Sequence, residues 1–166
     1  MKKPAIVLIL ILFILSNLLA QVPEIPDPAL NDIAMTTWCF GRLPNGQTYQ
    51  GPIIIFNPVI TAQVGPYLTE FFKFHEYGHI VLGHIQSRYY LSNPYNYLWV
   101  SNIQELEADT YSVTVLIKKN QVECVRQAFM WFNGVQPFKS SLMHPAGKER
   151  AINIFNTAAR LGVQLK

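Results

Sequence analysis

The sequence predicts an α+β domain that is mostly helical and carries a small antiparallel sheet. An Asn-Gly turn lies between two runs rich in β-branched and aromatic residues, and four later segments carry helix signals. The chain has 166 residues, of which 50% are hydrophobic, so it can bury the core of one domain. Only 14% are charged and the net charge is +3, so the sequence indicates neither a disordered chain nor a nucleic-acid-binding protein.

The N-terminus predicts export. Residues 5–15 are an unbroken apolar run that follows two lysines, and Ala20 offers a small residue for cleavage. We expect residues 1–20 to be a signal peptide and the domain to be periplasmic or secreted. The alternative is an uncleaved membrane anchor, although the run is shorter than the ~20 residues of a spanning helix. In an oxidising compartment Cys39 and Cys124 could form a disulfide, or they could be two buried thiols.

The segment after the signal peptide predicts an arm and a hairpin. Residues 21–34 contain three prolines and indicate an N-terminal arm or linker. Met35–Arg42 and Gln47–Asn57 are expected to be strands joined around Asn45-Gly46. Prolines bracket residues 53–57, which favours an edge strand that could hold an extended substrate by main-chain hydrogen bonds. A plain core strand is the alternative.

The remainder predicts helices. Residues 89–99 indicate a loop rich in Tyr, Asn and Pro, and Ser101 with Gln104 resembles a capping box. Helices are expected over residues 67–88, 101–119, 121–132 and 145–162.

The chemistry lies on the first of these helices, in His75-Glu76-Tyr77-Gly78-His79. Two histidines four residues apart share a helix face and can bind one zinc ion, while Glu76 can reach a metal-activated water as general base. Gly78 costs about 1 kcal/mol in a helix interior, which indicates close approach of another backbone. The alternative is an ordinary helix with surface His and Glu.

A third zinc ligand is expected from the next helix. Glu105 and Asp109 are four residues apart and share a face, so one can bind the metal while the other holds a histidine. Glu107 points elsewhere and is expected to be solvated or structural. An ordinary acidic helix start is the alternative.

Two further histidines remain. His84 follows His79 by five residues, so a continuous helix would rotate it off the ligand face into a structural or orienting role. His144 precedes a helix-starting proline and could return to the site as a hydrogen-bond donor or a fourth ligand.

The three motifs HEYGH, ELEAD and HPAGKER, in this order within residues 69–155, resemble the HtpX/CAAX-prenyl-protease type of zinc metallopeptidase, of the gluzincin class. The resemblance implies a zincin-like fold with an HExxH active-site helix and one Zn²⁺ per chain. It implies a minimal soluble catalytic domain over residues 35–166. The residues that it assigns are the zinc ligands His75, His79 and Glu105, the catalytic Glu76 and His144, and the supporting Asp109 and Arg150.

The expected function is that of a zinc-dependent endopeptidase that hydrolyses peptide bonds in exported or envelope proteins. Its partners would be protein or peptide substrates, with no nucleic acid and with membrane contact only through an uncleaved N-terminal segment. A catalytically latent or inactive zinc-binding chaperone or binding module on the same scaffold is the main alternative. An envelope protein with a chance motif is another.

Overall fold

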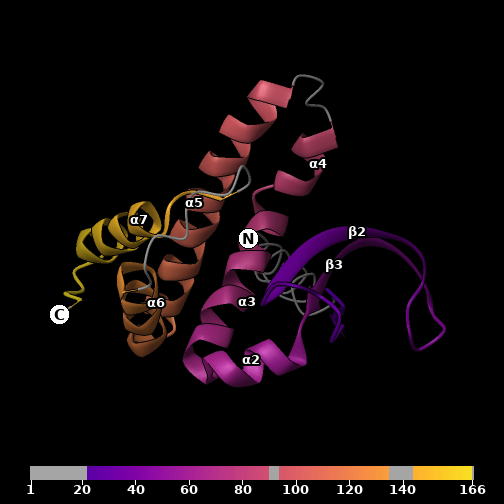
Figure 1. Ribbon diagram of the computed structural model, residues 1–166, viewed down its shortest axis with the longest axis horizontal. Coiled ribbons are helices and arrows are strands. Elements are labelled where there is room, and N and C mark those ends of the chain that lie inside the picture. Colours follow the sequence, from indigo (N-terminus) through magenta and orange to yellow (C-terminus); the bar gives the residue numbers. More distant parts are fainter. Residues whose placement is uncertain (1–21, 90–93, 135–143, 166) are drawn as a thin grey trace, which may run out of the picture.

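The computed structural model describes residues 22–89, 94–134 and 144–165, so the predicted signal peptide lies outside the described residues. Six helices and a three-stranded mixed sheet make up the described part, which confirms the α+β class. The elements in chain order are β1 (Glu24–Pro26), β2 (Ala34–Arg42), β3 (Thr48–Phe56), α2 (Pro58–Val64), α3 (Pro66–Val81), α4 (His84–Tyr89), α5 (Pro94–Lys118), α6 (Val122–Gly134) and α7 (Gly147–Arg160). Figure 1 shows α3 between the sheet on one side and α5, α6 and α7 on the other.

The predicted hairpin is present. β2 and β3 pair antiparallel from Ala34 with Phe56 to Arg42 with Thr48, and Gly46 adopts a φ of 83° in the turn. The tip of the hairpin projects away from the helices (Figure 1). The pairing follows from the Asn-Gly turn, because this dipeptide adopts the positive φ angles of tight hairpins.

The sheet differs from the prediction in its third strand. β1 forms inside the expected arm and pairs parallel with β3, Glu24 opposite Ile54, so the sheet is mixed rather than antiparallel. The order β1-β3-β2 makes β3 the central strand, so the prediction of an edge strand at residues 53–57 was wrong. Main-chain pairing with both neighbours and the burial of Ile53 and Ile54 outweigh the bracketing prolines.

The arm is held to the domain by side chains as well. Glu24 contacts Lys73 at 2.8 Å and accepts a hydrogen bond from the Tyr77 hydroxyl at 3.0 Å, and both partners lie on α3. Asn57 caps α2 through its side-chain oxygen and donates to the backbone oxygens of Pro28 and Leu30. The arm is therefore part of the fold rather than a free linker.

The long predicted helix over residues 67–88 is two helices. α3 ends at Val81, Gly83 adopts a left-handed φ of 73°, and α4 begins at His84. α5 begins at Pro94, so part of the expected loop is helical, and residues 90–93 lie outside the described residues. Ser101 and Gln104 are buried inside α5, so the predicted capping box there was wrong.

The core fills the space between α3, α5, α6 and α7. Its most deeply buried side chains include Phe71, Val113, Leu116, Val125 and Ile154. Cys39 and Cys124 are free thiols, and Cys124 packs in this core.

In the part of the chain that the structure describes, none of the helices combines the length and apolar character required to cross a membrane.

Candidate metal centre

The site is built where α3 crosses α5 at very short distance. A Cβ atom added to Gly78 would lie 3.1 Å from Ala108 Cα and 3.2 Å from both Ala108 O and Tyr111 Cβ. Only glycine allows the two helices to approach so closely, as the sequence indicated. The crossing brings the histidines of α3 against the acidic residues of α5.

Three donor atoms converge at this crossing. His75 Nε2 and His79 Nε2 are 3.1 Å apart, and each lies 3.3 Å from an oxygen of Glu105. Donors held 2.0–2.2 Å from a tetrahedral zinc ion are separated by about 3.3–3.5 Å. All three side chains are buried, and the group could hold a metal ion.

Asp109 and Arg150 support His75 from behind. Asp109 Oδ1 lies 2.9 Å from His75 Nδ1, and Arg150 donates to both Asp109 oxygens at 2.6 and 2.8 Å. The Arg150 guanidinium in turn lies 4.2 Å from the centre of the Phe132 ring. Burial raises the pKa of Asp109, but the charge and hydrogen bonds of Arg150 have the larger, opposite effect. The pKa is therefore lowered overall, and the carboxylate stays ionised. It can thus accept the Nδ1 proton and leave His75 Nε2 facing the other donors.

The electrostatics of the cluster favour a cation. Burial lowers the pKa of His75, but its hydrogen bonds to the carboxylates of Asp109 and Glu105 outweigh burial and raise the pKa to about 10. Burial likewise raises the pKa of Glu105, whereas hydrogen bonds with His144, His75 and His79 lower it well below the usual range. The carboxylates thus favour a positive charge, carried by a proton or by a metal ion, at the point where the three donors meet.

Glu76 lies beside the three donors without being one of the group. It is 6% exposed, and its carboxylate accepts a hydrogen bond from the hydroxyl of Thr36 on β2. Burial raises the pKa of Glu76, while His75 and the Thr36 hydrogen bond lower it by less. Sequence reasoning missed Thr36, because no local pattern shows that β2 packs against α3.

The remaining histidines also reach the cluster. His144 Nδ1 lies 3.1 Å from Glu105 Oε2, and its side chain is 48% exposed. His84 Nδ1 lies 2.9 Å from His79 Nδ1, and His84 Nε2 lies 3.1 Å from Glu107 Oε2. The break at Gly83 returns His84 to His79, so its expected rotation away from the site was wrong. Glu107 is largely solvated as predicted, but it also contacts His84.

The acidic and basic side chains buried in the described part of the chain all belong to this cluster. They are His75, Glu76, His79, His84, Glu105, Asp109 and Arg150. Buried charges are costly unless they are paired or used, so such a concentration indicates a functional site.

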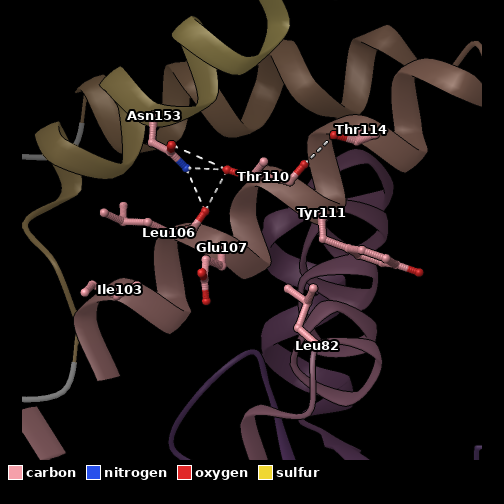
Figure 2. Close-up of a pocket in the computed structure, with 8 residues that line it drawn as sticks. All are labelled: Leu82, Ile103, Leu106, Glu107, Thr110, Tyr111, Thr114 and Asn153. Carbon is pink, nitrogen blue, oxygen red and sulfur yellow. Dashed lines mark hydrogen bonds between the residues drawn. The ribbon is translucent and has the colours of Figure 1, made fainter. Parts of the chain in front are cut away.

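A separate pocket of about 400 Å³ lies on another side of α5. Figure 2 shows Leu82, Ile103, Leu106 and Tyr111 around it, with Glu107 among them. In the wall of this pocket, the Asn153 side chain of α7 donates to the Leu106 carbonyl at 2.8 Å and to the Thr110 hydroxyl at 3.2 Å. The pocket is mostly apolar and does not contain the three donor side chains.

The chain was also compared with known proteins. No family model, curated protein or solved structure matches it. The resemblance based on three short motifs therefore remains a prediction.

Proposed function

We propose that this protein is a zinc-dependent endopeptidase of zincin-like fold. The observation that carries the proposal is the convergence of His75, His79 and Glu105 at the separations of a zinc ligand set, with Glu76 beside them. Two imidazoles and one carboxylate are a donor set found in catalytic zinc sites, which leave one position open. The motifs HEYGH and ELEAD, which suggested a gluzincin, supply these side chains from α3 and α5.

The roles of the residues follow from their contacts. His75, His79 and Glu105 would hold one zinc ion per chain. A bound zinc ion polarises a carbonyl oxygen and lowers the pKa of a water molecule beside it. Glu76 would take the proton of the attacking water and deliver it to the leaving amine. Burial raises the pKa of Glu76, which favours a carboxyl group that can hold the proton before it delivers it.

Thr36, Asp109 and Arg150 would position these groups. Thr36 fixes the Glu76 carboxylate, and the Arg150–Asp109 pair fixes His75. The exposed side chain of His144 stands next to Glu105, where it could donate to the developing oxyanion or serve as a fourth ligand.

The substrate would be an extended peptide. β2 is an edge strand, it contacts α3 and α4, and its Thr36 touches Glu76. Among the described residues no strand covers its outer edge, so a peptide could add there by main-chain hydrogen bonds close to the catalytic carboxylate. Export of the chain, as predicted, would make exported or envelope proteins its substrates.

The test combines metal content with cleavage. The purified protein, Glu76→Gln and Glu70→Gln would each be assayed for zinc by atomic absorption and for hydrolysis of an unfolded protein. Glu70 lies on the same helix outside the cluster, so its variant is a matched control. We expect about one zinc per chain in all three proteins, and loss of cleavage by at least about 10²-fold only in Glu76→Gln.

Two outcomes would contradict the proposal. Absence of zinc from the folded protein would remove the metal centre itself. Zinc binding without cleavage by the unsubstituted protein would favour the alternative, a zinc-binding chaperone or binding module on the same scaffold.

A further inference from the structure

We propose that Glu107 and His84 form a hydrogen-bonded relay that fixes the tautomer of His79 and so directs its Nε2 lone pair to the metal. The proposal rests on the metal centre proposed above. It makes His84 and Glu107 positioning residues, a role that the three motifs do not give them.

The relay is continuous from the protein surface to the donor cluster. Glu107 Oε2 lies 3.1 Å from His84 Nε2, and His84 Nδ1 lies 2.9 Å from His79 Nδ1. The other ring nitrogen of His79, Nε2, lies 3.1 Å from His75 Nε2 in the donor cluster. His84 is 4% exposed, whereas the Glu107 side chain is 55% exposed, so the relay runs from water inward.

The break between α3 and α4 places His84 next to His79. A continuous helix would place His84 about 140° around the axis from His79. α3 instead ends at Val81, and the left-handed φ of Gly83 starts α4 in a new direction, with His84 as its first residue. The His79 and His84 rings then meet edge to face, with centroids 5.0 Å apart.

The proton positions follow from the donors and acceptors available. A carboxylate only accepts hydrogen bonds, so the proton on His84 must lie on Nε2, toward Glu107. A neutral imidazole carries one proton, so His84 Nδ1 is an acceptor. His79 Nδ1 must then donate to it, and His79 Nε2 is left with a lone pair. The direction of the relay is thus fixed by the acidic group at its outer end.

The tautomer of His75 is fixed in the same way, but by a single carboxylate in direct contact with its Nδ1. Its Nδ1 faces Asp109 directly, and Arg150 holds that carboxylate in the interior. Both histidines of the proposed ligand set therefore present Nε2 to the metal. The buried Asp109 orients His75, whereas His84, which is itself bonded to the surface residue Glu107, orients His79. Figure 2 shows that this glutamate, Glu107, also borders the apolar pocket.

The experiment compares variants that keep or remove each link. His84→Phe keeps a ring but cannot accept a hydrogen bond, whereas His84→Gln can accept one and donate another. Glu107→Gln can donate to His84 Nε2, which permits the reversed and unproductive tautomer. Glu70→Gln is the control for loss of a carboxylate elsewhere. Zn²⁺ affinity would be measured by competition with a chromogenic chelator, and unfolding by urea would verify that each variant is folded.

We expect His84→Phe and Glu107→Gln to bind Zn²⁺ about 10–100-fold more weakly, because partners of ligand histidines contribute this much to affinity. His84→Gln should recover most of the loss, and Glu70→Gln should bind as the unsubstituted protein does. Unchanged affinity in both His84→Phe and Glu107→Gln would overturn the relay, as would a His84→Gln variant no better than His84→Phe.

A second readout does not depend on the metal. Long-range ¹⁵N–¹H correlation spectra of the metal-free protein should show the His79 proton on Nδ1, and Glu107→Gln should move a fraction of it to Nε2. A proton on His79 Nε2 in the unsubstituted protein would overturn the relay whether or not zinc binds. Failure of all proteins to bind Zn²⁺, with the proton on Nδ1, would overturn the proposed function and leave the relay standing.

Discussion

Replacement of Gly78 by alanine tests the helix crossing on which the proposed metal centre depends. The new methyl group would meet Ala108 Cα at 3.1 Å, and Ala108 O and Tyr111 Cβ at 3.2 Å. Comfortable carbon contacts begin at about 3.5 Å, so α3 and α5 would have to separate by about 0.4 Å. The three atoms belong to the α5 backbone or stand next to it, so no side-chain rotation can relieve the contact.

Two opposing effects set the change in stability. Alanine favours a helix interior over glycine by about 1 kcal/mol. Overpacking of a tight interface costs about 1–3 kcal/mol. We expect a net loss of about 1 kcal/mol in the free energy of unfolding. The effect on the metal should be at least as large, because zinc sites tolerate displacements of only about 0.2 Å and the crossing sets the 3.3 Å separations from Glu105.

The assay is urea unfolding together with Zn²⁺ affinity. Gly134→Ala is a suitable control, because it ends α6 and no described atom lies within 4 Å of its added Cβ. We expect Gly134→Ala to remain within about 0.5 kcal/mol of the unsubstituted protein. For Gly78→Ala we expect lower stability and about tenfold weaker Zn²⁺ binding. If Gly78→Ala were equally stable and bound zinc with unchanged affinity, the close approach of α3 and α5 would be refuted.

Three further substitutions test other contacts. Asp109→Asn leaves a buried guanidinium without its carboxylate and should destabilise the fold by about 3–5 kcal/mol in urea unfolding; a loss below 1 kcal/mol would show that the pair is dispensable. Thr36→Val removes the hydrogen bond to Glu76 and should lower kcat/KM about tenfold, whereas Thr36→Ser should retain it; equal rates in the two variants would count against a positioning role. His144→Ala should keep one zinc per chain and lose about 10²-fold in kcat. Loss of zinc would identify His144 as a ligand, and faster cleavage would identify it as an inhibitory contact.

Local signals in the sequence predicted the hairpin and the end of the last helix well. Asn45-Gly46 defines the turn between β2 and β3, and Gly162, with a φ of 80°, follows the end of α7. The break after α3 was not predicted, although Gly83 is a residue that permits left-handed backbone at a helix end. The apolar and histidine-rich sequence on both sides hid that break.

Long-range pairing was beyond the reach of local signals. β1 is three residues long and gains its hydrogen bonds from β3, which lies some thirty residues later in the chain. Its own prolines indicate an irregular arm, so only the neighbouring strand makes it a strand. The order of the strands, and with it the central position of β3, depends on the same pairing.

In the candidate site, too, local patterns could be predicted from the sequence and contacts between distant elements could not. Helix periodicity was enough to place His75 with His79 and Glu105 with Asp109. It could not show that α3 meets α5 at Gly78, although the glycine hinted at it, or that Thr36 of β2 reaches Glu76. The link from His84 to Glu107 depends on the break at Gly83, so it could not be found while one long helix was expected.

The balance of buried charge favours a cation at the α3–α5 interface. Glu76, Glu105 and Asp109 are buried together, and Arg150 is the one buried guanidinium among the described residues. If all three carboxylates were ionised and the histidines neutral, Arg150 would leave two negative charges in the interior; burial raises the pKa of Glu76, which reduces this excess. Such charge costs several kcal/mol per ion unless it is compensated. A divalent cation at the three donors would compensate this charge, and protonation of His75, whose pKa is raised by hydrogen bonds to Asp109 and Glu105, would compensate part of it. The proposed metal centre and the stability of the α3–α5 interface are thus expected to depend on the same ion.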